Sequence, residues 1–433
     1  MSRPVIGFAG LTHLGLVSAV AAASKGFRVV GYDVDRDRIA RIEAGRLAVV
    51  EPGLDELYRE HRTRLSFSDR PSALRECDVV YVASDVPTDA RGVADLENLS
   101  ALIERVLPAL DDGAVLVVLS QVPPGFTRGL ALPAARRFYQ VETLVFGRAV
   151  ERAMRPERFI VGCIDPDASL PPAYAALLQA FGCPILTMRY ESAELAKIAI
   201  NCYLVAAVTV ANTLAEISER IGADWGEIVP ALRLDARIGP QAYLTPGLGL
   251  AGGNLERDLA TVLRLSAGTG TETGVIRAFL RNSWHRRDWV LRVLHAEVLA
   301  FNADAMIGVL GLAYKENTDS TRNSPSLELI SHLKPWRLRV YDPVVSARVA
   351  AHPAFYYAAA ALEAAQGADA LVIMTPWSVF RELKPSDLAA VMAGRTVIDP
   401  HRVLDGRAVA MAGLDYFALG MPSLRAGRRR PDA

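Results

Sequence analysis

The sequence predicts an α/β protein in which two doubly wound α/β domains are joined by a helical middle domain. At both ends of the chain, apolar runs of strand length alternate with amphipathic runs of helix length, a pattern typical of parallel sheets with crossover helices. Between residue 191 and about residue 295, long helical patterns such as 191–220 replace the strand pattern. A chain of 433 residues is also too long for one ordinary core. We therefore expect domains at residues 1–190, 191–300 and 301–433.

The expected strands are short and apolar, as strands buried on both faces of a parallel sheet are. In the first domain they cover residues 5–9, 28–32, 78–83, 115–120 and 159–162. In the last domain they cover residues 305–312, 337–341, 370–375 and 395–399. Both ends of the chain therefore have the alternation of a Rossmann-like fold, although their sequences show no tandem repeat.

Composition excludes several classes of function. Hydrophobic residues make up 51% of the chain and charged residues 22%, the balance of a globular protein. Lys+Arg and Asp+Glu each number 48, so no net field attracts nucleic acid or an anionic membrane. The apolar runs 204–211 and 306–312 are much shorter than the roughly 20 residues that cross a bilayer. We expect neither nucleic acid nor membrane as a partner.

Cysteine usage and the N-terminus indicate a cytoplasmic protein. The four cysteines lack the spacing of a metal site, so we expect no metal. Three of them lie in apolar contexts of the kind found in a reducing compartment. The chain runs directly into its first strand without the pattern of a secretory leader.

A turn suited to a dinucleotide follows the first strand. Gly10 and Gly15 occupy the outer positions of a G-x-G-x-x-G pattern, in which glycines allow a tight turn and the next helix points its N-terminus at the pyrophosphate. The middle glycine is replaced by Thr12, so a purely structural turn stays open on the motif alone. His13 either lies near the cofactor or has no catalytic role. We assign all four residues to cofactor binding.

An acidic residue ends the second strand. Asp33 lies about 20 residues after the turn, where a carboxylate binds the adenosine ribose hydroxyls and favours NAD over NADP. Its alternative role is the N-cap of the following helix, and the nearby Arg36 and Arg38 leave NADP open. Thr88 and Ser120 follow later strands at the carboxyl edge, where cofactors bind in open sheets, or are plain loop caps.

Several longer motifs resemble those of the UDP-glucose/GDP-mannose dehydrogenase family. One is the helical segment Ala-Glu-Leu-Ala-Lys-Ile-Ala-Ile-Asn at 193–201. A second comprises 235–239, Tyr243, the glycine-rich segment 246–253 and the pair at 257–258. The third is Leu-Gly-Leu-Ala-Tyr-Lys-Glu-Asn-Thr-Asp at 310–319, followed by Arg322. The resemblance covers essentially the whole chain, in order.

The resemblance implies roles for several residues. Lys197 and Asn201 are four residues apart on one helix face and together form an oxyanion clamp for a sugar alkoxide. Asp258, with Glu142, is the expected proton acceptor. The substrate, a nucleotide sugar and most simply a UDP-sugar, is assigned to a further set of residues: Arg237, Tyr243, Gly252, Lys315 and Arg322. In the resembled family the middle domain forms a homodimer, and Arg237 is expected to reach a partner subunit's pocket.

One position departs from the resembled enzymes in a decisive way. They oxidise an alcohol to an acid through a thiohemiacetal and a thioester, which requires a cysteine where this chain has Asn254. Cys202 adjoins Asn201 on the helix and therefore points about 100° away, toward the core. A second carboxylate of the resembled enzymes is Phe146 here, while Glu142 is retained.

Three hypotheses follow from these departures. The leading one is an NAD-dependent nucleotide-sugar oxidoreductase that stops after two electrons, or oxidises and re-reduces one carbon. The second is a complete four-electron 6-dehydrogenase that works without a thioester. The third is a catalytically silent protein that binds NAD and a nucleotide sugar.

Overall fold

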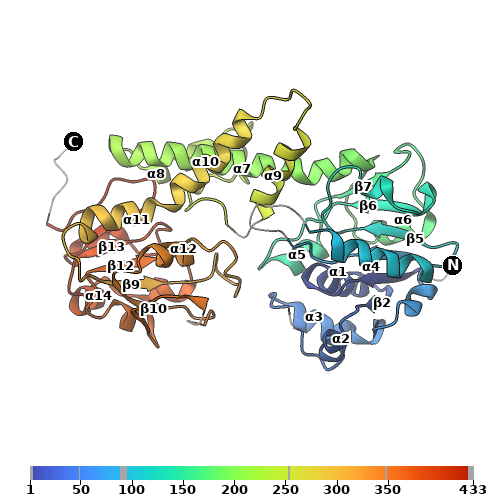
Figure 1. The fold of residues 1–433 in the computed structure, drawn as a ribbon, viewed down its shortest axis with the longest axis horizontal. Coiled ribbons are helices and arrows are strands. Elements are labelled where there is room, and N and C mark those ends of the chain that lie inside the picture. The colour runs from blue at the N-terminus through green and yellow to red at the C-terminus, as the bar shows by residue number, and fades with distance from the viewer. Residues whose placement is uncertain (1–2, 48, 88–94, 252–253, 347–348, 428–433) are drawn as a thin grey trace. The chain divides into compact units, whose positions relative to one another are not determined.

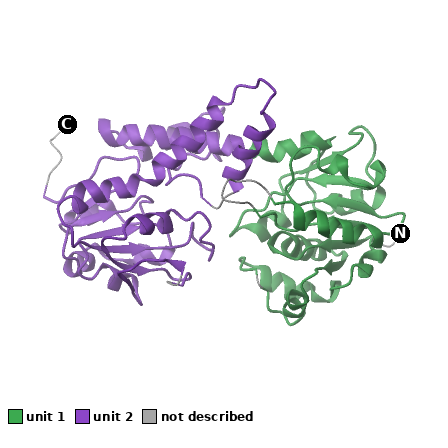
Figure 2. Cartoon of the chain, viewed as in Figure 1, with its two compact units in different colours: residues 1–200 green, residues 201–433 purple. Residues whose placement is uncertain are grey.

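A computed structural model describes residues 3–47, 49–87, 95–251, 254–346 and 349–427. The chain divides into two compact units, unit 1 at residues 1–200 and unit 2 at residues 201–433 (Figure 2). This division does not test the three expected domain boundaries, which stay predictions. Two residues with expected roles, Thr88 and Gly252, lie outside the described residues.

Unit 1, coloured blue to green in Figure 1, is built on one mostly parallel sheet. Its strand order is β3-β2-β1-β4-β5-β6-β7-β8. Its first six positions follow the 3-2-1-4-5-6 order of dinucleotide-binding folds, and only the β6–β7 pair is antiparallel. The strands are β1 (Val5–Ala9), β2 (Arg28–Tyr32), β3 (Leu65–Ser68), β4 (Val79–Val82), β5 (Val115–Val118), β6 (Arg137–Gln140), β7 (Phe159–Cys163) and β8 (Ile185–Arg189).

Helices cover both faces of this sheet. One buried cluster joins the strands to α1, α3, α5 and α6, and a second joins them to α4 and the start of α7. This arrangement confirms the predicted doubly wound fold. The helices are α1 (His13–Ser24), α2 (Arg36–Glu43), α3 (Leu54–His61), α4 (Glu97–Val106), α5 (Ala149–Met154), α6 (Pro172–Gln179) and α7 (Tyr190–Ile221), which continues into unit 2.

Unit 2 contains a smaller, wholly parallel sheet with the order β11-β10-β9-β12-β13-β14 (Figure 1). This order is again 3-2-1-4-5-6 when its strands are counted from β9, so the two ends of the chain share one topology. The strands are β9 (Met306–Leu310), β10 (Arg337–Tyr341), β11 (Phe355–Tyr357), β12 (Ala370–Ile373), β13 (Thr396–Ile398) and β14 (Asp415–Phe417).

The predicted helical middle part precedes this sheet in the chain. It consists of the second part of α7 with α8 (Trp225–Leu234), α9 (Asn254–Leu265), α10 (Gly274–Arg287) and α11 (Trp289–Leu294). The helices that accompany the sheet are α12 (Pro325–His332), α13 (Ala361–Ala365), α14 (Pro385–Val391) and α15 (Gly406–Met411). The fold class predicted from the sequence is therefore confirmed: two Rossmann-like α/β parts flank a helical one.

Helix α7 is more apolar over its length than the apolar run 204–211 within it indicates. Within the described part of the chain it is the one helix long and apolar enough to cross a membrane, with a mean hydropathy of 1.7 over its best window. Core helices of soluble proteins meet the same criterion. Ala193 at the start of α7 is fully buried among the strands of unit 1. The expectation that no segment spans a membrane stays a prediction.

Candidate active site

The turn after β1 has the close packing that a dinucleotide turn requires. Gly10 has a φ of 89°, and a Cβ atom there would lie 3.0 Å from the backbone nitrogen of Ser84. A Cβ atom on Gly15, in the first turn of α1, would lie 1.7 Å from the carbonyl oxygen of Gly10. Neither position tolerates a side chain, so the strand-to-helix approach fits the pyrophosphate turn of NAD-binding folds.

Asp33 lies at the carboxyl end of β2 and is buried. Its Oδ2 accepts a 2.7 Å hydrogen bond from the backbone N–H of Leu11, and the Arg38 guanidinium pairs with both carboxylate oxygens at 2.7 Å. The N-cap of α2 is Asp35, whose side chain accepts from the N–H of Arg38. Asp33 is therefore not the N-cap. It bridges the dinucleotide turn and Arg38, while Arg36 pairs with Asp69 on the surface.

The remaining expected cofactor residues lie around the start of α1. Thr12 precedes the helix with a φ of −73°, a conformation open to any residue, and its Oγ1 accepts a 3.0 Å hydrogen bond from the N–H of Asp85. The N–H of His13 donates to Oδ2 of Asp85 at 3.0 Å. Ser120 is fully buried after β5, and its hydroxyl donates to the carbonyl of Ser84 at 2.6 Å. Ser120 thus ties together the ends of β4 and β5.

A buried carboxylate, Glu51, connects this turn to the segment that carries Glu142. Glu51 accepts hydrogen bonds from Nε2 of His13 at 2.8 Å, from the N–H of Gly147 at 2.9 Å and from the N–H of Ala149 at 3.1 Å. The ring of Phe146 packs on the His13 ring with centroids 4.3 Å apart. The loop before α5 is therefore held against the first turn of α1.

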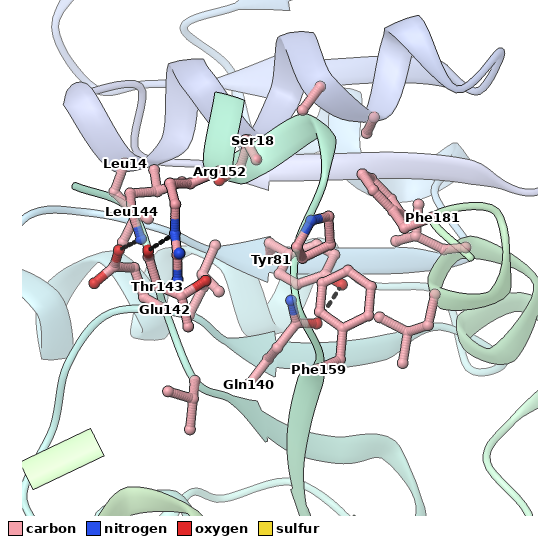
Figure 3. A pocket seen from close by; sticks show the side chains of 18 of the residues that line it. Leu14, Ser18, Tyr81, Gln140, Glu142, Thr143, Leu144, Arg152, Phe159 and Phe181 are labelled. Atoms are coloured by element: carbon pink, nitrogen blue, oxygen red, sulfur yellow. Dashed lines mark hydrogen bonds between the residues drawn. The ribbon is translucent and has the colours of Figure 1, made fainter. Parts of the chain in front are cut away.

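A largely apolar cavity of about 70 Å³ in unit 1 borders the backbone that presents Glu142 (Figure 3). Glu142 and Arg152 lie at one end, and Arg152 donates to the carbonyl of Thr143 at 3.3 Å. Tyr81 and Gln140 lie toward the other end, joined by a 2.8 Å hydrogen bond. The Glu142 segment thus forms one wall of this cavity.

In unit 1, the first pair of expected catalytic residues is in contact. Nζ of Lys197, on α7, lies 3.2 Å from Oε2 of Glu142, and both side chains are largely buried. Glu142 also accepts a hydrogen bond from the N–H of Leu144, which orients its carboxylate. The pair places an ammonium donor and a carboxylate acceptor side by side.

In unit 2, the second pair is also in contact. The amide of Asn201, one turn after Lys197 on α7, donates to Oδ2 of Asp258 on α9. Both residues are buried, and Nε of Arg257 lies 3.5 Å from Oδ1 of Asp258. Asn254 is exposed at the first position of α9, four residues before Asp258 and therefore on the same helix face.

The four thiols of the chain are free, and their surroundings disfavour the thiolate. Burial raises the pKa of Cys77 to about 12 and also raises the pKa of Cys163 and Cys183. Cys202 packs against the apolar cluster of Val205 and Leu259. Its pKa is raised by burial first and by the Asp258 carboxylate second. No described thiol therefore has the electropositive surroundings of a reactive cysteine.

The expected nucleotide-sugar residues of the last domain share one loop. Lys315 and Arg322 lie between β9 and α12, where the N–H of Tyr314 bonds the carbonyl of Ser320 at 3.0 Å and folds the loop back. At the end of β10, Asp342 is buried and accepts from the N–H of Leu312 at 2.6 Å. Asp342 thus supports this loop as Asp33 supports the turn after β1.

A polar network missed by sequence reasoning joins this loop to α9. Glu256, on α9, accepts a 2.7 Å hydrogen bond from the amide of Asn323 and pairs with Arg287. Arg287 also donates to the carbonyl of Leu250 at 2.6 Å, within the glycine-rich segment that precedes α9. Unit 2 therefore brings the start of α9 and the Lys315 loop together, although Glu256 and Asn323 are 67 residues apart in the chain.

Two expected substrate residues, Arg237 and Tyr243, do not belong to the network of Glu256, Arg287 and Asn323. Arg237 is highly exposed and forms a two-point ion pair with Asp235, the residue two positions before it. Tyr243 is about half exposed. Their expected contact with a substrate or a partner subunit stays a prediction.

Comparison with known proteins places these features in one family. Residues 5–178 match the NAD binding domain of the UDP-glucose/GDP-mannose dehydrogenase family, residues 191–283 its central domain and residues 308–406 its UDP binding domain. The UDP-glucose 6-dehydrogenase TuaD of Bacillus subtilis is 29% identical, over 96% of this chain and 93% of that protein.

Two solved structures are similar along nearly the whole chain. A UDP-glucose dehydrogenase from the hyperthermophilic archaeon Pyrobaculum islandicum has a TM-score of 0.85 and 29% identity, covering 97% of this chain and 98% of its own. UDP-D-ManNAc dehydrogenase from Pyrococcus horikoshii has a TM-score of 0.82 and 25% identity, covering 96% of this chain and 99% of its own.

The fold, the dinucleotide turn and these matches define the class: an NAD-dependent oxidoreductase acting on a CH–OH group of a nucleotide sugar. Its cofactor is NAD, as the buried carboxylate at the end of β2 predicted. The chain belongs to the UDP-glucose/GDP-mannose dehydrogenase family.

Proposed function

We propose that this protein oxidises one carbinol carbon of a UDP-sugar by two electrons, giving a carbonyl product or, after re-reduction, an epimer. The observation that carries the proposal is Asn254, a carboxamide at the first position of α9 and on the face of Asp258. The resemblance to the family puts a nucleophilic thiol at this position. A carboxamide forms neither a thiohemiacetal nor a thioester, so the second oxidation loses its covalent route.

The polar pairs support the first oxidation. Conversion of CH–OH to a carbonyl releases a hydride, which NAD accepts when bound, and a proton, which a side chain of this protein must accept. Asp258 and Glu142 are the carboxylates assigned to that proton. Nζ of Lys197 lies beside Glu142, and the amide of Asn201 donates to Asp258, so each expected donor to the alkoxide is held next to a candidate proton acceptor.

The other thiols offer no substitute for a nucleophile at position 254. Burial raises the pKa of each of the four cysteines, and Asp258 raises that of Cys202 further. Phe146 packs on His13 where the resembled enzymes carry a second carboxylate, which removes a candidate for water activation. Both observations favour the two-electron reaction over a complete 6-dehydrogenase.

The substrate and assembly are part of the same proposal. The match of residues 308–406 to a UDP binding domain supports a UDP-sugar, with Lys315 and Arg322 as cations for the two phosphates.

A stripe on α7 comprising Tyr203, Val210, Leu214, Ile217 and Ile221 is exposed in the single chain. We assign this stripe to a homodimer, and the protein to the cytoplasm, as for a biosynthetic enzyme.

The proposal is tested by counting reducing equivalents. Purified protein is incubated with NAD and single UDP-, GDP- and dTDP-sugars, while NADH is measured by absorbance and the sugar product by mass spectrometry. We expect one NADH per UDP-sugar consumed, or a new epimer without net NADH. Two NADH per sugar and an acid product would establish the four-electron reaction instead. Tight binding of both ligands without turnover would establish a silent binding protein.

A further inference from the structure

We infer that Asp85 acts as a built-in competitor of the cofactor's pyrophosphate at the start of α1. The Asp85 carboxylate accepts the backbone N–H of His13 at 3.0 Å, and the Asp85 N–H donates to Oγ1 of Thr12 at 3.0 Å. These reciprocal hydrogen bonds join the loop after β4 to the first turn of α1. The carboxylate is therefore fixed on the helix terminus rather than merely close to it.

The position that Asp85 occupies is the one that a dinucleotide needs. The first backbone N–H groups of a helix have no partner inside the helix, and they carry partial positive charge. In folds with this strand order and turn, the pyrophosphate accepts hydrogen bonds from these groups. Two anions do not share one N–H group at hydrogen-bond distance, so the pyrophosphate and the Asp85 carboxylate exclude each other.

Thr12 has a defined part in this arrangement. The middle position of the glycine-rich motif is usually glycine because the pyrophosphate approaches the backbone closely there. Here the φ of −73° needs no glycine, and the threonine hydroxyl serves as the acceptor that holds the Asp85 backbone. The threonine that replaces the motif's middle glycine therefore also holds the blocking Asp85 in place.

The surrounding charges strengthen the effect. His13 has one carboxylate on its backbone N–H and a second, the buried Glu51, on its ring. Asp85 itself is exposed, so its side chain has solvent to move into. Binding of NAD therefore requires the Asp85 carboxylate to leave the helix terminus. Breaking its hydrogen bond lowers the affinity for ligands that carry a pyrophosphate, whereas the affinity for adenosine alone is unaffected. This inference concerns cofactor binding only and holds whichever reaction follows.

The test compares ligands that differ in the pyrophosphate. Dissociation constants for NAD, ADP and adenosine are measured by titration calorimetry with the wild-type protein and with Asp85→Asn, which keeps the size and removes the charge. We expect the variant to bind NAD and ADP about tenfold more tightly, because a charge-assisted hydrogen bond no longer has to be broken. Adenosine, which has no phosphate, should change by less than about twofold.

Two further variants make the result specific. Asp55→Asn, in the exposed first turn of α3, makes the same change in net charge and should leave all three dissociation constants unaltered. Thr12→Val keeps the shape of the side chain but removes the acceptor for Asp85, and it should tighten ADP binding severalfold. The inference is overturned if Asp85→Asn leaves ADP binding unchanged or weakens it, or if adenosine gains as much as ADP.

Discussion

Asn254 and Asp258 share a face of α9, and in the proposed reaction the side chain at residue 254 decides whether a second oxidation can follow the first. The residues expected to handle the proton are paired and largely buried within each unit: Lys197 with Glu142 in unit 1, and Asn201 with Asp258 in unit 2. Covalent capture of the resulting carbonyl needs a thiolate, which an amide cannot supply. Under the proposed function, the extent of oxidation depends on one functional group.

We expect Asn254→Cys to restore the second oxidation. A thiol at the first position of a helix has a favoured thiolate, because the helix terminus is partially positive. The variant should form a second NADH and an acid, and iodoacetamide at pH 8 should label one thiol beyond those labelled in the wild type. The four native thiols should react slowly, because their raised pKa values keep the thiolate scarce at that pH.

Asn254→Ser is the matched control, since serine has the size of cysteine without its nucleophilicity at neutral pH. It should keep the wild-type stoichiometry. If Asn254→Cys is labelled yet produces no acid, residue 254 does not meet the reacting carbon, and our explanation of the altered chemistry is wrong.

At the scale of elements, Glu51 is the buried group that holds three segments of unit 1 together. Its carboxylate accepts from the His13 ring on α1 and from two backbone N–H groups at the start of α5. The loop that it holds carries Phe146 and follows the Glu142 segment, which borders the cavity (Figure 3). Glu51 is therefore the shared acceptor that joins the first turn of α1 to the start of α5.

We expect Glu51→Ala to lower the free energy of unfolding by about 2 kcal/mol, because it leaves buried N–H groups without an acceptor. Glu51→Gln should cost less, since the amide oxygen still accepts. Both are measured by urea denaturation followed by circular dichroism. Glu56→Ala, an exposed position on α3, is the control and should lie within about 0.5 kcal/mol of the wild type. Equal stability of Glu51→Ala and wild type would show that the loop is ordered by other contacts.

At the scale of the whole molecule, the α7 stripe exposes large apolar side chains to solvent in the single chain. Its five apolar side chains recur at spacings of seven, four, three and four residues, which places them on one side of the helix. A contiguous apolar surface of this kind is typical of a protein interface. Helix α7 also carries Lys197 and Asn201, so an interface on it would stabilise the helix from which these two side chains project.

We expect Val210→Glu and Ile217→Glu to convert a dimer into a monomer, since each buries a charge in an apolar contact without a partner. Sedimentation equilibrium gives the mass of each variant and of the wild type. Met411→Glu, a highly exposed apolar residue on α15 outside the stripe, is the control and should remain dimeric. A wild-type protein that sediments as a monomer would remove the stripe from the assembly.

Much of the fold was predictable from the sequence because short runs of neighbouring residues determine where the central strands form. The apolar runs at residues 5–9, 28–32 and 337–341 became strands with those same bounds, since central strands of parallel sheets are buried on both faces. The strands β3, β6, β8, β11 and β14 were missed. Four of them mix polar with apolar residues, as Arg-Phe-Tyr-Gln does in β6, and β11 has three residues, so no apolar run of strand length marks them.

In the candidate site, too, some residues were predictable from local sequence and others were not. The glycine turn and Asp33 were readable from local spacing, because their geometry depends on a few neighbouring residues and on one strand order. Glu51, Asp85 and Asn323 carried no such signal: their partners lie 38, 72 and 67 residues away in the chain. A hydrogen bond forms between whichever groups the packed backbone brings within about 3 Å, so only the tertiary structure decided which carboxylates orient the site and which one blocks it.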